Sequence, residues 1–182
     1  SAQDCMVIFS SSETVEEITK FRKHALSKTV LIELSLDDLP LSNMGTKFWQ
    51  HQLDIDKEKK QHRSYQLFWI WLSKSWCVVQ AIRQNYFNSN LNGDGIFMWQ
   101  DIGAFRNKRY NGKLIIKHPQ IIPPKTILWM AHHPIKPPPT LIWNDKYDQK
   151  QLFFHSGSQG AGDSRAWLDY HEKFAQTIQQ FL

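Results

Sequence analysis

A single carboxylate ends the most strand-like segment of the sequence. Residues 96–99 are an uninterrupted apolar run that follows a turn rich in Asn, Gly and Asp, and Asp101 comes just after the run. Such a run predicts a strand covered on both faces, as in the middle of an α/β sheet. Ligands of open α/β sheets bind outside the carboxyl ends of the strands, so Asp101 is a candidate for ligand or metal binding. The alternative is a turn carboxylate that accepts hydrogen bonds from nearby backbone amides.

A glycine-containing segment near the end of the chain is the second candidate. Residues 155–164 contain three glycines and lie between an apolar run at 152–154 and a helix expected over about 165–181. We expect a loop in which the amides of Gly160 and Gly162 face a ligand, with Asp163 or Ser164 as the helix N-cap. A purely structural turn is equally consistent with the glycines. His155, at the end of the expected strand, is either a metal or phosphate ligand or a packed histidine.

Isolated cations supply the candidate anion-binding groups. Lys74 stands alone within the apolar segment 62–85, so its ammonium either extends to the surface or pairs with an anion, and the first is the simpler expectation. Arg106 begins a polar loop that either faces a phosphate or is a solvated hairpin. Arg63 lies at the start of the apolar segment and adds a further positive charge.

Composition excludes several classes of protein. The 182 residues fit one domain, and their net charge of +5 is scattered rather than gathered in a stripe, which argues against nucleic-acid binding. The two cysteines form neither a metal-binding spacing nor a disulfide framework, and we expect both to be buried thiols. No segment is long and apolar enough to predict a membrane span. Asp54 and Asp56 form an Asp-x-Asp pattern, but their charged neighbours indicate a solvated face rather than a metal site.

The pattern of elements predicts an α/β protein. A strand at 5–9, a helix from Thr14 to about Ser27 with Glu17 completing a capping box, and a strand at 30–34 form a β-α-β unit, which is typical of parallel sheets. Residues 37–61 are expected to be irregular. Residues 62–85 predict a helix buried on most sides, with a break at Ser73 or Ser75. Further short strands are expected at 114–116 and 127–130.

Several of these motifs together resemble the HtrL/YibB family. The similar segments are 62–64, Trp71 with Lys74, 87–89 and, most densely, 99–106. The family comprises bacterial proteins linked to lipopolysaccharide-core biosynthesis and is similar to GT-A nucleotide-sugar transferases. The resemblance implies a single GT-A-like (Rossmann-related) α/β domain over residues 1–182, with a mostly parallel central sheet flanked by helices. Because the opening strand resembles the family's second strand, we expect an N-terminal truncation in which the first strand is lacking.

The resemblance also implies a function. Asp101 stands where GT-A enzymes carry their metal-binding Asp-x-Asp motif, which implies Mn²⁺ or Mg²⁺ bound by Asp101 with His155 or Asp163. The expected reaction transfers a sugar from a nucleotide-sugar to a glycan or lipid-linked acceptor, with Lys74, Arg63 and Arg106 offsetting the diphosphate charge and Asp163 serving the acceptor, as a base or by binding its hydroxyls. The alternative is a non-catalytic α/β module that binds a nucleotide-sugar or glycan.

Overall fold

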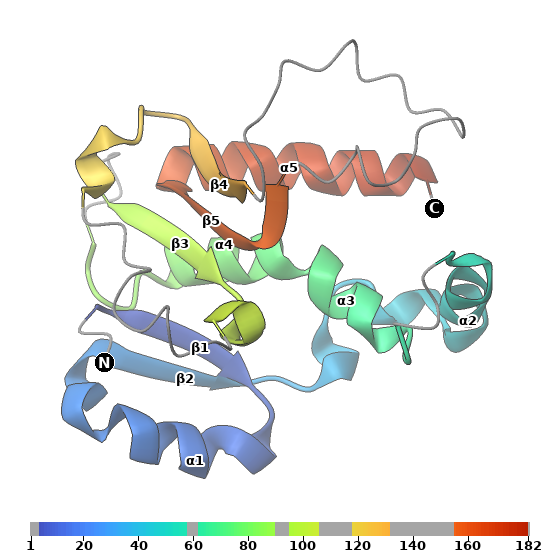
Figure 1. The fold of residues 1–182 in the computed structure, drawn as a ribbon, viewed down its shortest axis with the longest axis horizontal. Helices are drawn as coiled ribbons and strands as arrows, with labels where there is room; N and C mark the ends of the chain where they lie inside the picture. Colours follow the sequence, from blue (N-terminus) through green and yellow to red (C-terminus); the bar gives the residue numbers. More distant parts are fainter. Residues whose placement is uncertain (1–3, 58–61, 90–94, 106–117, 132–154, 182) are drawn as a thin grey trace.

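The protein is a mixed α/β structure with two small sheets. The computed structural model describes residues 4–57, 62–89, 95–105, 118–131 and 155–181. These residues form a two-stranded parallel sheet and a three-stranded antiparallel sheet, with helices packed around both (Figure 1). Within the described ranges, no helix combines the length and apolar character that crossing a membrane requires.

The N-terminal unit is the β-α-β crossover that the sequence predicts. The buried guanidinium of Arg22 donates from Nε to Thr29 Oγ1 at 2.9 Å and from Nη2 to the Asp4 carbonyl oxygen at 3.1 Å, which ties the end of the helix to the starts of both strands. The helix begins before Thr14, with Ser11 as its N-cap residue, so the predicted capping box is wrong. The elements are β1 (Met6–Ser10), α1 (Ser12–Arg22), a 3-10 segment (Lys23–Lys28) and β2 (Thr29–Glu33), with β1 and β2 parallel.

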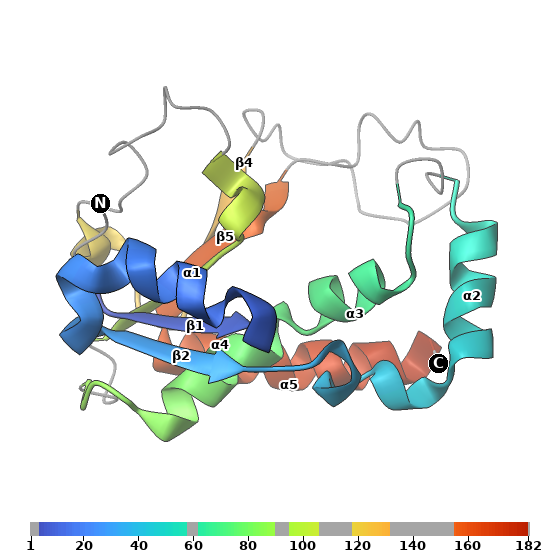
Figure 2. The same cartoon turned by 90° about the horizontal axis from the view of Figure 1, so that it is seen from below.

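The segment expected to be irregular contains a helix, α2 (Thr46–Ile55), at one end of the molecule (Figure 2). Trp49 anchors it: the side chain is buried, and its Nε1 donates to the Leu41 carbonyl oxygen at 2.8 Å. Trp49 packs with Leu39 and Trp69 in an apolar cluster. Two 3-10 turns precede α2, at Leu36–Asp38 and Ser42–Met44.

The long apolar segment forms two helices, α3 (Gln66–Leu72) and α4 (Lys74–Gln84). The predicted break is confirmed at Ser73, which is buried and belongs to neither helix. Burial raises the pKa of the Cys77 thiol on α4 to about 12, as expected for an inert core thiol. Cys5, by contrast, is exposed, so the prediction that both thiols are buried is wrong.

The C-terminal half of the chain forms the antiparallel sheet, in the order β3-β5-β4. The prediction that β3 lies inside a mostly parallel sheet is therefore wrong for the described residues: β3 is an edge strand whose described partner is antiparallel. The two faces of β3 differ in exposure although both are apolar: Phe97 and Trp99 pack on the helices, whereas Met98 is 41% exposed. The elements are β3 (Ile96–Gln100), a 3-10 turn (Ile102–Phe105), a second 3-10 turn (Pro119–Ile121), β4 (Ile127–Ala131), β5 (His155–Asp163) and α5 (Ser164–Phe181).

Helices α4 and α5 cover one face of this sheet (Figure 1). Trp167 of α5 is fully buried against Val78 and Ile82 of α4, and its Nε1 donates to the Phe97 carbonyl oxygen at 2.9 Å. This contact fixes α5 to β3. Lys74, the first residue of α4, lies over the ring of Trp99, so the start of α4 is on the same sheet face as that side chain. The strands predicted at 114–116 and 152–154 lie outside the described residues.

Candidate functional site

Asp101 lies where β3 ends and is held by three hydrogen bonds. Its backbone amide donates to the Ser158 carbonyl oxygen of β5 at 2.9 Å, which fixes the chain at this point. Its carboxylate accepts from Trp99 Nε1 at Oδ1 and from Lys74 Nζ at Oδ2, both at 2.7 Å. The side chain is still 30% exposed. Asp101 is thus a partly exposed carboxylate of fixed orientation at the carboxyl end of a strand, as predicted.

Lys74 joins three segments that are distant in the sequence. Besides Asp101, its ammonium donates to the carbonyl oxygen of Gly157 in β5 at 2.9 Å, and it lies 5.9 Å from the ring centroid of Trp99. The simpler expectation, an ammonium extended to the surface, is therefore wrong. Lys74 pairs with an anion and is only 14% exposed.

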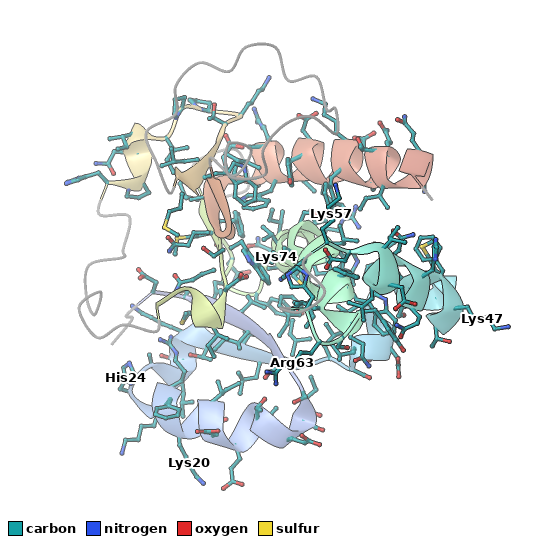
Figure 3. The ribbon with its side chains drawn as sticks, turned by 45° about the vertical axis from the view of Figure 1, so that its right-hand side comes forward. Lys20, His24, Lys47, Lys57, Arg63 and Lys74 are labelled. Atoms are coloured by element: carbon teal, nitrogen blue, oxygen red, sulfur yellow. The ribbon has the colours of Figure 1, made fainter. Side chains whose placement is uncertain are left out.

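The contrast with other cations is visible in Figure 3. Lys20 and Lys47 project from the periphery of the molecule, whereas Lys74 lies near its middle. Lys20 is paired with Glu16 one helical turn away, and its side chain is 72% exposed. Lys74 is placed differently because the break at Ser73 makes it the first residue of α4, within hydrogen-bonding distance of Asp101 at the end of β3. A lysine at a helix N-terminus adds to the positive end of the helix dipole, so this position favours an anion such as Asp101.

Asp163 does not belong to the same site. Asp163 pairs with Ile96 at the amino end of β3, whereas Asp101 follows the carboxyl end. At about 3.3 Å per residue, the two carboxylates are separated by about 16 Å of strand, too far to share a metal or a diphosphate. The Asp163 side chain is 2% exposed and accepts from the backbone amides of Ala166 and Lys125, both at 2.7 Å. It is the N-cap of α5, as one of the two expected alternatives predicts, and both of its oxygens are already bound.

Gly160 and Gly162 form part of a strand, not of a loop. Both lie within β5, paired with β3 on one side and β4 on the other, so their amides do not form the predicted ligand-binding turn. A Cβ atom at Gly160 would lie 2.6 Å from the Trp129 ring, and one at Gly162 would lie 2.6 Å from the Thr126 carbonyl oxygen. Glycine is required at both positions because residues in or just before the neighbouring strand β4 occupy the space that a side chain would need.

The remaining predicted site residues are less fully described. His155 begins β5, opposite Ala131 and two residues before Gly157, which places its backbone near the Lys74 end of the strand; its side chain is outside the description. Arg63 is exposed in the segment that precedes α3 (Figure 3). Arg106 lies outside the described residues.

The described donors around Asp101 do not fit a divalent metal ion, and the side chain of His155, the other predicted ligand, lies outside the description. Among the described residues, no three or more His, Cys, Asp or Glu side chains are grouped in a way that could hold a metal. Each oxygen of Asp101 already accepts a hydrogen bond, and the Lys74 ammonium is in direct contact with one of them. A divalent ion about 4 Å from an ammonium is repelled by about 8 kcal/mol at an effective dielectric constant of about 20. The predicted Mn²⁺ or Mg²⁺ site at Asp101 thus conflicts with the position of Lys74.

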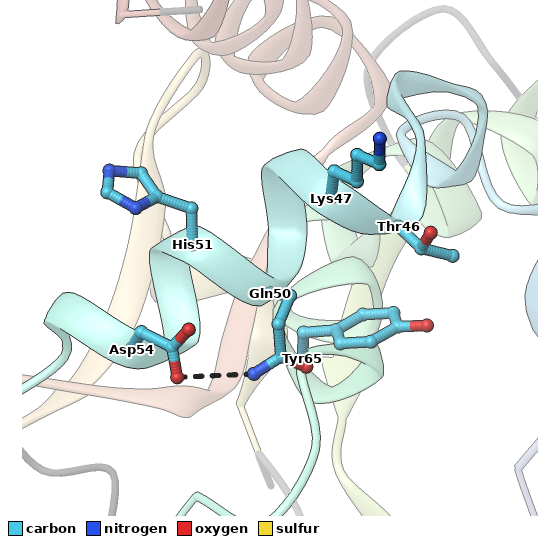
Figure 4. A pocket seen from close by; sticks show the side chains of 6 residues that line it. All are labelled: Thr46, Lys47, Gln50, His51, Asp54 and Tyr65. Atoms are coloured by element: carbon cyan, nitrogen blue, oxygen red, sulfur yellow. Dashed lines mark hydrogen bonds between the residues drawn. The ribbon is translucent and has the colours of Figure 1, made fainter.

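A shallow pocket of about 470 Å³ lies elsewhere, along α2 (Figure 4). The residues that line it carry polar side chains and are mostly exposed. The Asp-x-Asp pattern begins here: Asp54 accepts from Gln50 Nε2 at 3.3 Å, while Asp56 pairs with His62 Nδ1 at 2.5 Å. The pocket is lined by Thr46, Lys47, Gln50, His51, Asp54 and Tyr65.

Sequence reasoning missed three contributors to the Asp101 site. Trp99 orients the carboxylate, and the carbonyl oxygens of Gly157 and Ser158 bind Lys74 and the Asp101 amide. The spacing of Trp99 and Asp101, two residues apart at the end of a strand, was a usable signal, because such residues share one side of the chain. The two carbonyl groups carry no sequence signal, since any residue supplies one. Comparison of the chain with protein-family models, with curated proteins and with solved structures finds no match.

Proposed function

We propose that this chain is a glycosyltransferase-like domain of the HtrL/YibB type that binds a nucleotide-sugar at the carboxyl end of β3. In this proposal the fold is GT-A-like, and the sugar is transferred to a glycan or lipid-linked acceptor. The observation that supports it most is the Lys74–Asp101 pair, which joins α4, β3 and β5 in a partly exposed position.

The chemistry of the pair suits a sugar diphosphate. The Lys74 ammonium and the N-terminus of α4 favour a negatively charged group, and charge that develops on a leaving diphosphate is stabilised by fixed cations of this kind. Asp101 holds the ammonium in place, and each of its oxygens retains a lone pair for a hydroxyl of the ligand. Arg63 and Arg106 are proposed to add positive charge.

Isothermal titration calorimetry with UDP- and GDP-sugars tests the proposal. Replacing Lys74 with Met removes a charge-assisted hydrogen bond, so we expect about a 10- to 100-fold loss of affinity. Lys47→Met is the matched control, because Lys47 also lies in the first turn of a helix but outside this site. Failure of every nucleotide-sugar to bind would overturn the proposal. A loss in Lys47→Met rather than in Lys74→Met would move the binding site to the α2 pocket.

A non-catalytic binding module is the second candidate. It is favoured by the engagement of both Asp101 oxygens in hydrogen bonds within the protein, which is how a structural ion pair is held. Asp101→Ala distinguishes the two functions: it should leave ligand affinity nearly unchanged in a binding module and reduce it strongly in a transferase. Release of free nucleotide from the nucleotide-sugar in the presence of acceptor glycans, measured in parallel, separates transfer from binding.

A further inference from the structure

We infer that the Lys74 ammonium takes the place of a divalent metal ion, so that this site binds a nucleoside diphosphate without a metal. The inference rests on the proposed function and names the means by which the diphosphate charge is offset. It replaces the expectation that Mn²⁺ or Mg²⁺ bridges Asp101 and the diphosphate.

The surroundings of the ammonium are those of a cation site. Lys74 Nζ lies 2.7 Å from a carboxylate oxygen of Asp101 and 2.9 Å from the backbone carbonyl oxygen of Gly157. Carboxylate and carbonyl oxygens are the ligands that hard divalent ions prefer. The ring face of Trp99, 5.9 Å away, is a further partner for a cation. Two oxygen ligands and an aromatic face thus already surround a positive charge that belongs to the chain itself.

The ammonium also retains the capacity to bind a ligand. A lysine side chain has three N–H donors, and Asp101 and Gly157 take two of them. No other described residue takes the third donor, which can reach a phosphate oxygen where the pair is exposed, since the lysine and aspartate side chains are 14% and 30% exposed. A metal at the same carboxylate would have to displace this ammonium or remain beside it against charge repulsion.

The position of the second carboxylate supports the same conclusion. The oxygens of Asp163 bind the backbone amides of Ala166 and Lys125 at the opposite end of β3, so this side chain does not complete a metal site at Asp101. A lone carboxylate binds Mg²⁺ or Mn²⁺ weakly without further ligands. A lysine held by that carboxylate supplies positive charge without needing them.

The first experiment measures UDP and GDP binding to the full chain by calorimetry, in EDTA and in MnCl₂. We expect the dissociation constant to agree within about threefold between the two buffers, and Lys74→Met to weaken binding in EDTA by about 10- to 100-fold. Lys47→Met should leave it unchanged. Binding that occurs only with Mn²⁺ overturns the inference but leaves the proposed function standing. Absence of binding in both buffers overturns both.

The second experiment uses Mn²⁺ alone and reads the bound ion by electron paramagnetic resonance. We expect no binding at Asp101 in the wild-type chain, because Lys74 occupies its oxygen. In Lys74→Met, the freed oxygens of Asp101 and Gly157 should bind Mn²⁺ measurably, and the double variant with Asp101→Asn should lose this binding again. Lys74→Arg, which keeps the charge, should still exclude Mn²⁺ and so shows whether the positive charge is what keeps the ion out. Binding of Mn²⁺ to the wild-type chain that Asp101→Asn abolishes would overturn the inference.

Discussion

Two aspartates at opposite ends of one strand pair are held in opposite ways. Asp163, beside the amino end of β3, is 2% exposed, and both of its oxygens accept hydrogen bonds from backbone amides. Asp101, after the carboxyl end, is 30% exposed, and both of its oxygens accept hydrogen bonds from the side chains of Trp99 and Lys74. Both are aspartates beside the same pair of strands, so neither residue type nor proximity to the sheet explains why one is buried and the other partly exposed.

The difference lies in what each carboxylate needs in order to exchange its partner. The amides that bind Asp163 belong to the first turn of α5 and to the turn before β4, so releasing them requires local unfolding. The ammonium that binds Asp101 is at the end of a flexible four-carbon chain and can turn toward a ligand without backbone movement. Asp163 therefore belongs to the structural framework, the contacts that hold the fold together. Asp101 can exchange its partner for a ligand.

The largest expected effect is on stability, at Asp163. Asp163→Ala removes the N-cap of α5 and leaves two amides without their acceptor, so the free energy of unfolding should fall by about 2–4 kcal/mol. Urea denaturation followed by circular dichroism measures the loss. Asp169→Ala on the same helix is the control, because its exposed ion pair with Lys173 should contribute less than about 1 kcal/mol. If the two variants lose the same free energy of unfolding, Asp163 contributes no more to the fold than an exposed surface residue.

The next largest effect is expected at the glycines of β5, which lie near the Asp163 end and the Asp101 end of the β3–β5 strand pair. Gly162→Ala places a Cβ atom 2.6 Å from the backbone oxygen of Thr126, which cannot rotate away, so unfolding free energy should fall by about 1–3 kcal/mol. Among the described residues, a Cβ atom at Gly157 would meet Lys74 Nζ alone, at 3.9 Å, so Gly157→Ala should change stability by less than about 0.5 kcal/mol. The same urea measurement decides the matter. A Gly157→Ala variant as unstable as Gly162→Ala would show that the Asp101 end is as tightly packed as the Asp163 end.

A smaller loss of stability is expected at Asp101. Asp101→Asn keeps an acceptor for Trp99 and removes the charge opposite Lys74, so unfolding free energy should fall by about 1 kcal/mol. A double-mutant cycle with Lys74→Met isolates the pair, and its coupling energy should decrease in high salt because the pair is partly exposed. A loss at Asp101 as large as that at Asp163 would place both carboxylates in the framework and weaken the proposed ligand-binding role.

The sequence predicted much of the local structure. The β-α-β unit, the break at Ser73, the strand at β4 and a capped start of the last helix near Asp163 all follow from short-range signals: apolar spacing, turn residues and N-cap preference. The placement of Asp101 at a strand end follows from the same signals. A helix in 37–61 was missed because its apolar residues are few and its start has no side-chain cap.

Strand direction and the true neighbours of Asp101 were not predictable in the same way. The glycines of β5 resemble a loop because glycine weakens a strand, and only the Trp129 ring and the Thr126 backbone, brought in by β4, explain them. The family resemblance implied that Asp163 lies beside Asp101, whereas antiparallel pairing puts Gly157 and Ser158 there. Contacts between residues this far apart in the chain depend on pairing, which local patterns do not encode.

The smallest expected effect is on the pH dependence of stability, through the contact between α5, which Asp163 caps, and α4, which carries Lys74. His171 of α5 shares a hydrogen bond of 3.0 Å with Ser75 Oγ, next to Lys74, and burial together with the positive charge of Arg83 lowers the His171 pKa below its ordinary value of 6.5. The unfolded chain therefore binds more protons near pH 6, and stability should fall as the pH drops below about 6.5. Urea unfolding at pH 7.5 and at pH 5.5, in wild type and in His171→Gln, measures this contribution as the difference between the two pH dependences. A His171→Gln variant with the same pH dependence as wild type would show that protonation here does not loosen the contact between the helix that Asp163 caps and the helix that carries Lys74.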